Sequence, residues 1–129
     1  MEKPRINSMF ITNSQQDKPI LSTTIKDDGI EVDLHIQFIN FTMSKHKFMV
    51  SVKDENGHEY LDGKPNNYDF SGVETIPDES HSSIGEVVMF IKMTKEETTG
   101  INYIIIRVKI DDDDELEGTI ILYLNRGDA

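Results

Sequence analysis

The sequence predicts an all-β protein, folded as a single antiparallel β-sandwich of about seven to nine strands. Apolar and polar residues alternate over residues 30–38, which is the pattern of a strand with one buried face. Segments rich in β-branched residues recur along the chain with turn signals between them. No stretch of about ten residues has a convincing 3.6-residue period, so no long helix is expected.

The N-terminal part supplies the first strands. Residues 5–12 and 20–26 are predicted strands, and residues 30–38 form the clearest one. Its apolar face carries Ile30, Val32, Leu34, Ile36 and Phe38. The apolar pattern then moves to odd positions from Phe41 onward, which predicts a bulge or bend at residues 39–40.

A hairpin and a long connection follow. Residues 48–52 alternate again, and the turn at residues 54–57 ends in Asn-Gly, so residues 58–61 are predicted to return as the second strand. Residues 62–83 contain several proline and glycine turns and are predicted to form a long irregular connection. A short strand is expected within it at residues 68–73.

The C-terminal part supplies the remaining strands. Residues 86–94, 101–110 and 118–124 are rich in β-branched or alternating apolar residues. The best helical candidate is residues 94–100, which we expect to form one short turn closed by Gly100.

The segment Thr99-Gly100-Ile101-Asn102-Tyr103, followed by the strand at residues 104–110, resembles a corner found in known folds. In immunoglobulin-like and fibronectin-type-III-like sandwiches, a tyrosine before the penultimate strand bonds back to the backbone of this corner. The resemblance covers about the last third of the chain. It implies a Greek-key, immunoglobulin-like sandwich with Tyr103 as the corner tyrosine, and it implies nothing about catalysis.

Composition limits the possible functions. The chain has 129 residues with 13 Lys and Arg against 24 Asp and Glu, so its net charge is -11. This length suits one domain spanning residues 1–129. The acidic balance argues against binding nucleic acid through its phosphates. Without cysteine there is no disulfide, thiolate nucleophile or cysteine-based zinc site.

The sequence also predicts a location. The N-terminal residues lack the apolar core of a signal peptide, and no apolar run approaches the roughly 20 residues that cross a bilayer. We therefore expect a soluble, cytoplasmic protein with no membrane contact.

The densest charge cluster, residues 111–117, lies between two predicted strands. Its carboxylates are hard oxygen ligands, so a calcium site is one interpretation. The calcium candidates are Asp111, Asp113, Glu115 and Glu117. A solvated hairpin turn is the favoured interpretation, because the spacing differs from that of known calcium loops and no second acidic loop is obvious.

Acidic charge is uneven along the chain. Residues 1–64 carry 8 basic and 10 acidic groups, whereas residues 65–129 carry 5 and 14. A strongly negative surface could steer a basic partner or imitate nucleic acid, which makes an acidic inhibitor or nucleic-acid mimic a further alternative.

No catalytic or cofactor motif is present, so we expect no enzyme activity and no cofactor. The histidines have no metal-type spacing and are predicted to lie at the surface: His35, His46, His58 and His81. Residues 80–83 place serines beside a histidine but lack the context of a nucleophile elbow. The C-terminal Arg-Gly-Asp at residues 126–128 is interpreted as a chance match.

Large apolar residues give the main functional clue. Those expected in the core include Phe38, Phe41, Phe48, Phe70, Phe90, Met43, Met49, Met89 and Met93. Neighbours of both parities are apolar at residues 48–50, 87–91 and 104–106, which predicts a second covered face. The cover would be residues 62–83 or a second copy in a homodimer. The leading hypothesis is thus a non-catalytic binding or assembly module that contacts a protein partner or itself.

Overall fold

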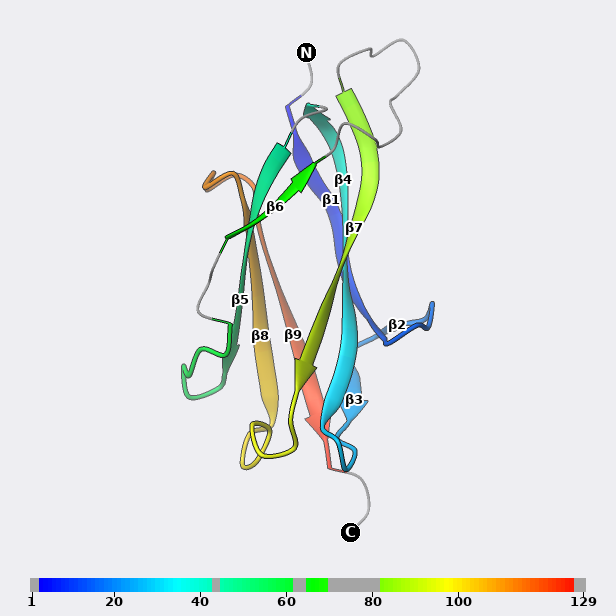
Figure 1. Cartoon of the computed structure of the whole chain (residues 1–129), viewed down its shortest axis with the longest axis vertical. Coiled ribbons are helices and arrows are strands. Elements are labelled where there is room, and N and C mark those ends of the chain that lie inside the picture. The colour runs from blue at the N-terminus through cyan, green and yellow to red at the C-terminus, as the bar shows by residue number, and fades with distance from the viewer. Residues whose placement is uncertain (1–2, 43–44, 62–64, 70–81, 127–129) are drawn as a thin grey trace.

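The computed structural model describes residues 3–42, 45–61, 65–69 and 82–126. These residues form nine strands and no helix, so the all-β prediction is confirmed (Figure 1). The strands are β1 (Arg5–Asn13), β2 (Pro19–Ile20), β3 (Ser22–Thr24), β4 (Ile30–Thr42), β5 (Lys45–Asp54), β6 (Pro65–Asp69), β7 (Ser82–Met93), β8 (Tyr103–Ile110) and β9 (Glu117–Asn125).

The strands form two sheets, an arrangement that is consistent with a β-sandwich (Figure 1). Sheet A has the order β2-β1-β4-β7, and sheet B has the order β3-β9-β8-β5-β6. Every strand pair is antiparallel except β3 and β9, which run parallel, so sheet B is mixed rather than purely antiparallel. The predicted strand at residues 20–26 is therefore two short strands, one in each sheet.

Residues from both sheets form one hydrophobic core. In β4 the predicted apolar face is fully buried, with Leu34 and Ile36 among its members. Met89 and Met93 of β7 are also buried, as expected. Phe90 contradicts the prediction, because 81% of its surface is exposed. It lies on the outer face of sheet A, since its neighbours in the strand point into the core.

Other residues expected in the core divide in the same way. Phe38, Phe41 and Phe48 are buried, whereas Met49 is only half-buried. Phe70 and Met43 lie outside the described residues.

The bulge predicted at residues 39–40 is present. The β4–β7 register shifts between Ile39 and Phe41, and Asn40 has a positive φ of 64°. The extra residue returns the apolar side chains to the core after the change in parity. A local alternation pattern was sufficient to locate this irregularity.

The predicted Asn-Gly turn follows β5, and Gly57 has a φ of 87°. Asp54 organises the turn by accepting the backbone N–H groups of Asn56 (2.8 Å) and His58 (3.1 Å) and the hydroxyl of Tyr60 (2.8 Å). The returning segment makes only one bridge, between Lys53 and Glu59, so the strand predicted at residues 58–61 is wrong. The next strand is β6, and the part of the predicted strand 68–73 beyond residue 69 lies outside the described residues.

A single helical turn joins β7 to β8, as predicted for residues 94–100. Thr94 and Glu97 form a reciprocal cap, in which the N–H of Glu97 donates to Thr94 Oγ1 (3.2 Å) and the N–H of Thr94 donates to Glu97 Oε1 (2.9 Å). Gly100, with a φ of 79°, ends the turn. Tyr60 supports it from β5's side, because its hydroxyl also contacts the carbonyl of Glu97 at 3.2 Å.

Candidate functional site

The acidic loop between β8 and β9 holds the four residues considered for calcium. Asp111 lies beside the start of β5, where its Oδ2 is 2.6 Å from Nδ1 of the His46 ring and its Oδ1 accepts the N–H of Lys47 at 2.9 Å. Asp113 accepts the N–H of Glu115 at 2.9 Å and so closes the turn. Both carboxylates are therefore engaged by groups of the chain itself.

Three of the remaining acids of the loop are paired with cations of β8, whereas the Glu115 carboxylate forms no ion pair with a described residue. Asp114 lies 2.7 Å from the Lys109 ammonium, with Asp112 at 3.7 Å, and Glu117 lies 3.1 Å from the Arg107 guanidinium. The structure thus places these carboxylates on separate partners. No group of three or more histidine or acidic side chains suited to a metal ion occurs in the described part of the chain. Calcium binding here remains an untested prediction.

The histidines do not share the surface environment predicted for them. His46 is buried at 7% exposure, in contact with Phe41 and Asp111, which contradicts the prediction. His46 is one of the core-facing residues of β5. Its ring lies beside the carboxylate of Asp111, 65 residues later in the chain, and this polar partner offsets the free-energy cost of burying the imidazole. His58 is exposed, His35 is half-buried, and His81 lies outside the described residues.

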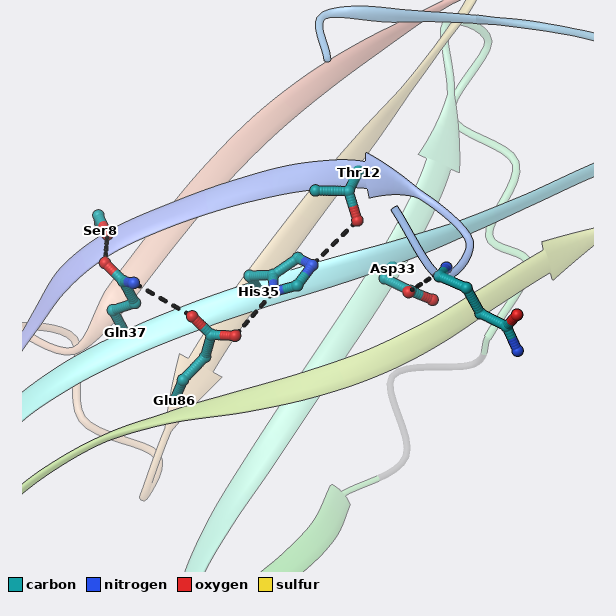
Figure 2. Close-up of polar contacts among 7 residues, drawn as sticks. Ser8, Thr12, Asp33, His35, Gln37 and Glu86 are labelled. Atoms are coloured by element: carbon teal, nitrogen blue, oxygen red, sulfur yellow. Dashed lines mark hydrogen bonds and ion pairs between the residues drawn. The ribbon is translucent and has the colours of Figure 1, made fainter. Parts of the chain in front are cut away.

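Figure 2 shows a polar network that crosses the outer face of sheet A. Ser8 of β1 donates to Gln37 of β4 at 2.5 Å, and Gln37 donates to Glu86 of β7 at 3.1 Å. Glu86 lies 2.8 Å from Nδ1 of His35, whose Nε2 is 3.0 Å from the hydroxyl of Thr12. Three strands distant in sequence are joined by this chain of side chains.

The order hydroxyl, imidazole, carboxylate is the order of a nucleophile with its base and orienting acid. Because the Glu86 carboxylate accepts from Nδ1, a neutral His35 leaves Nε2 free to accept the Thr12 hydroxyl. Thr12, however, is completely buried, and the ring of Phe10 stacks on His35 at a centroid distance of 4.5 Å. In this arrangement the hydroxyl is closed to a substrate, so the network supports sheet cohesion rather than chemistry.

Hydrogen bonding from His35 lowers the pKa of Glu86 below its usual value of 4.5; partial burial opposes this shift, and the Gln37 amide reinforces it. The network therefore favours the charged form of Glu86. The alternation of β4 placed His35 on the outer face, but no sequence signal identified its partners, which come from β1 and β7.

Asp33 lies on the same face, opposite the apolar side of β4. It is only 6% exposed, beside the turn that follows β1 (Figure 2). Its Oδ2 accepts the N–H of Gln15 at 3.1 Å, and Gln15 adopts a positive φ of 63° in that turn. Its Oδ1 is buried without a hydrogen-bond partner.

The outer face of sheet B carries an exposed apolar cluster, which we term the β8–β9 patch and define as Tyr103, Ile105, Ile121 and Tyr123. Ile105 pairs with Ile121 and Tyr103 pairs with Tyr123 across the two strands, with the tyrosine rings 5.6 Å apart. Ile121 is 44% exposed and Tyr123 is 54% exposed. Tyr103 therefore lies in this patch. The tyrosine hydroxyl that contacts the backbone of the turn before β8 belongs to Tyr60, which donates to the carbonyl of Glu97.

One lysine of β5 borders the β8–β9 patch. Lys53 of β5 lies opposite Ile105, and Lys45 and Lys47 occupy the same outer side of β5. All three are exposed, and none forms an ion pair with another described residue. Lys47 and Lys45 lie toward the acidic loop at the other end of β5, so Lys53 is the basic residue of β5 that lies beside the patch.

A polar cavity of about 430 Å³ lies where β1, β3, the start of β4 and the end of β9 meet. Hydroxyl and amide side chains such as Asn13, Ser22, Thr24 and Asn125 dominate its lining. Thr23 donates to Asn13 across it at 2.9 Å. Lys26, Asp28 and Glu31 also line the cavity, whereas no aromatic side chain among the described residues does.

Arg126, the first residue of the Arg-Gly-Asp sequence, is held by the fold. Its guanidinium donates to the carbonyls of Thr98 (3.3 Å) and Ile101. The other two residues of the tripeptide lie outside the described part.

The expected second cover over two-faced strands is tested only in part. Val88 and Ile105 are half-buried, while Phe90 is open to solvent. Most of residues 62–83 lie outside the described ranges, so their role as a cover remains a prediction.

Nowhere in the described ranges does the chain form a helix with the length and apolar character needed to cross a bilayer. No protein-family model matches the sequence, and comparison with curated proteins finds no match.

Proposed function

We propose that this chain is a non-catalytic protein-binding module that uses the β8–β9 patch as its interaction surface. The observation that carries the proposal is the exposure of Tyr123 and Ile121 beside each other on one strand. Tyrosine is enriched in protein interfaces because it offers a large apolar surface and a polar group that can remain hydrated. Because each of these side chains is already about half buried, their burial by a partner would contribute about 1.5 to 3 kcal/mol in total.

The charges around the patch indicate the kind of partner. Arg107 and Lys109 have acidic partners within the chain, whereas Lys53, opposite Ile105, forms no ion pair with a described residue. A protein surface with an apolar centre and acidic residues at its rim would complement both features. We therefore propose a heterologous protein with such a surface as the partner.

The proposed module is an immunoglobulin-like Greek-key sandwich. The strand orders support this proposal, because the chain passes from β4 in sheet A to β5 in sheet B and from β7 back to β8 in the same way. Domains of this kind present their sheet faces and end loops to partners and carry many unrelated functions. Function is therefore argued from the patch and not from the fold.

A displayed peptide library, selected on the full chain, tests the proposal. Selected peptides should contain apolar residues flanked by Asp or Glu, and a double variant with Ile121→Thr and Tyr123→Thr should bind them at least about tenfold more weakly. Threonine retains a high β propensity, so the strand should persist. Phe90→Thr, which removes an exposed apolar side chain from the other sheet, is the matched control and should bind normally.

Two results would overturn the proposal. One is that the selected peptides bind the unchanged chain, the double variant and the control variant equally well. The other is a dimer in light scattering that the double variant converts to a monomer, because a second copy would then occupy the patch in place of a heterologous partner.

A further inference from the structure

Strand β7 is the longest of the described edge strands. It has 12 residues and lies at the end of sheet A, where β4 is the one described strand that pairs with it (Figure 1). The other edge strands have two, three and five residues: β2, β3 and β6. A long edge offers a row of backbone N–H and carbonyl groups with which a further strand can pair.

The edge of β7 has few of the features that protect such edges from pairing. Proline, bulges and charged side chains commonly give this protection. β2 and β6 each begin with a proline, whereas β7 contains none. The register of β7 with β4 is regular from Gly85 to Met93, and Glu86 and Lys92 are its only charged residues. Residues 85–93 are therefore suited to accept another strand.

The two charges of β7 select what that strand is. Glu86 lies three residues before Met89, and Lys92 lies three residues after it. When two copies of β7 run antiparallel about a twofold axis at Met89, Glu86 of each copy lies opposite Lys92 of the other. No other axis brings these two charges together. Since opposite charges stabilise facing positions of a sheet and like charges destabilise them, the pattern favours a second copy in one register.

The same register matches the apolar residues of β7. On the outer face, Val88 lies opposite Phe90 of the second copy, and this ring is 81% exposed in the single chain. Aromatic and β-branched side chains stabilise each other at facing positions. On the inner face, where the side chains are buried, Val87 lies opposite Ile91 and Met89 lies opposite Met89. Apolar residues thus face apolar residues on both sides of the sheet.

We propose that two copies of the chain pair through residues 85–93 of β7, with the twofold axis at Met89. The two four-stranded sheets then join into one sheet of eight strands. Pairing over this length forms about eight to ten backbone hydrogen bonds. The β8–β9 patch lies on the other sheet and stays open to a heterologous partner, so this inference does not depend on the proposed function.

Sedimentation equilibrium of the full chain tests the proposal. The measurement is made in about 0.15 M salt, where a Debye length of about 8 Å limits the repulsion between two chains of net charge -11. The mass should rise from 14.8 kDa to twice that value as the chain concentration increases to about 1 mM. The double variant with Ile121→Thr and Tyr123→Thr should dimerise equally well.

Charge reversal tests the register. Lys92→Glu places a carboxylate opposite Glu86 of the second copy and should weaken dimerisation at least about fivefold, because the interface contains this pair twice. Glu86→Lys should weaken it similarly, and combining both changes should restore the dimer. Lys95→Glu is the matched control for Lys92→Glu. It makes the same change in net charge and breaks an ion pair with Asp27 at 3.7 Å, but it lies beyond the strand and should not affect dimerisation.

Disulfide formation supplies a second test if a charge-reversed variant does not fold. The chain has no cysteine, so single-cysteine variants report which residues meet. Facing residues of antiparallel strands have Cα atoms about 4.5 to 5.5 Å apart, within the range that a disulfide spans. An equimolar mixture of Val88→Cys and Phe90→Cys should form linked dimers under mild oxidation, and either variant alone should form far fewer.

Three outcomes would overturn the proposal. They are a monomer at every concentration, which would leave the edge to a strand of another protein, equal effects of Lys92→Glu and Lys95→Glu, and no more linked dimer in the cysteine mixture than in either variant alone. A dimer that Ile121→Thr with Tyr123→Thr converts to a monomer would overturn both this proposal and the proposed function. Selected peptides that bind without the β8–β9 patch would overturn the proposed function alone.

Discussion

Gly29 offers a quantitative test of how closely the start of β4 packs against the end of β7. It has a φ of 95°, and the N–H of Gly29 donates to the Lys26 carbonyl at 2.9 Å in the tight turn before β4. A Cβ atom at this position would lie 1.9 Å from the carbonyl oxygen of Met93. It would also lie 2.8 Å and 2.9 Å from backbone atoms of Thr94 and Lys95. Gly29→Ala therefore forces backbone to move, not a flexible side chain.

Two costs add in this variant. A non-glycine residue in a left-handed conformation costs about 1 to 2 kcal/mol. Displacing well-packed neighbours typically costs a further 1 to 3 kcal/mol or so. We expect Gly29→Ala to lower the free energy of unfolding by about 2 to 5 kcal/mol.

Two other glycines isolate the second cost. Gly57 and Gly100 have φ values of 87° and 79°, but a Cβ atom on either would meet nothing within 4 Å. Alanine at these positions should show only the conformational cost. Urea unfolding followed by circular dichroism should rank Gly29→Ala about 1 to 3 kcal/mol below both controls. Equal losses in the three variants would refute the close backbone contact at Gly29.

Three further predictions concern ionisable groups. The pKa of Glu86 is lowered by its bond with His35, so the unfolded chain takes up a proton first as the pH falls below about 4.5. The free energy of unfolding should therefore decrease in this pH range. Glu86→Gln should flatten this part of the curve of unfolding free energy against pH. Burial and the bond to Asp54 raise the pKa of Tyr60 from 10 to about 12, so the free energy of unfolding should fall between these pH values, and Tyr60→Phe should remove that fall. Millimolar Ca²⁺ should leave the melting temperature unchanged, because chain groups already engage every carboxylate of residues 111–117 except that of Glu115; an upward shift would support the calcium interpretation.

Features encoded within a few neighbouring residues could be predicted. The alternation in β4 identified its buried face, and the change of parity located the bulge at residues 39–40. The single turn at residues 94–100 was also predictable, because its cap joins residues three positions apart. Such features depend on backbone geometry that a short segment determines by itself.

Features that depend on another strand could not be predicted. Phe90 and Met89 are equally apolar, but only one side of β7 is covered by sheet B, so Phe90 is exposed. His46 is buried because its strand position faces the core and Asp111 meets it from a distant loop. A two-residue period assigns side chains to alternate faces of a strand but does not reveal what lies over each face.

The candidate sites show the same division. The sequence by itself determined that Asp33, His35 and Gln37 share one face of a strand, and that apolar neighbours occur at Ile104–Ile106. Only the tertiary structure decided that Glu86 bonds His35, that Phe90 opposes Asp33, and that β8 and β9 align their exposed apolar side chains. The physical reason is that strand pairing brings together residues tens of positions apart, and register is set by the packing of the whole sheet.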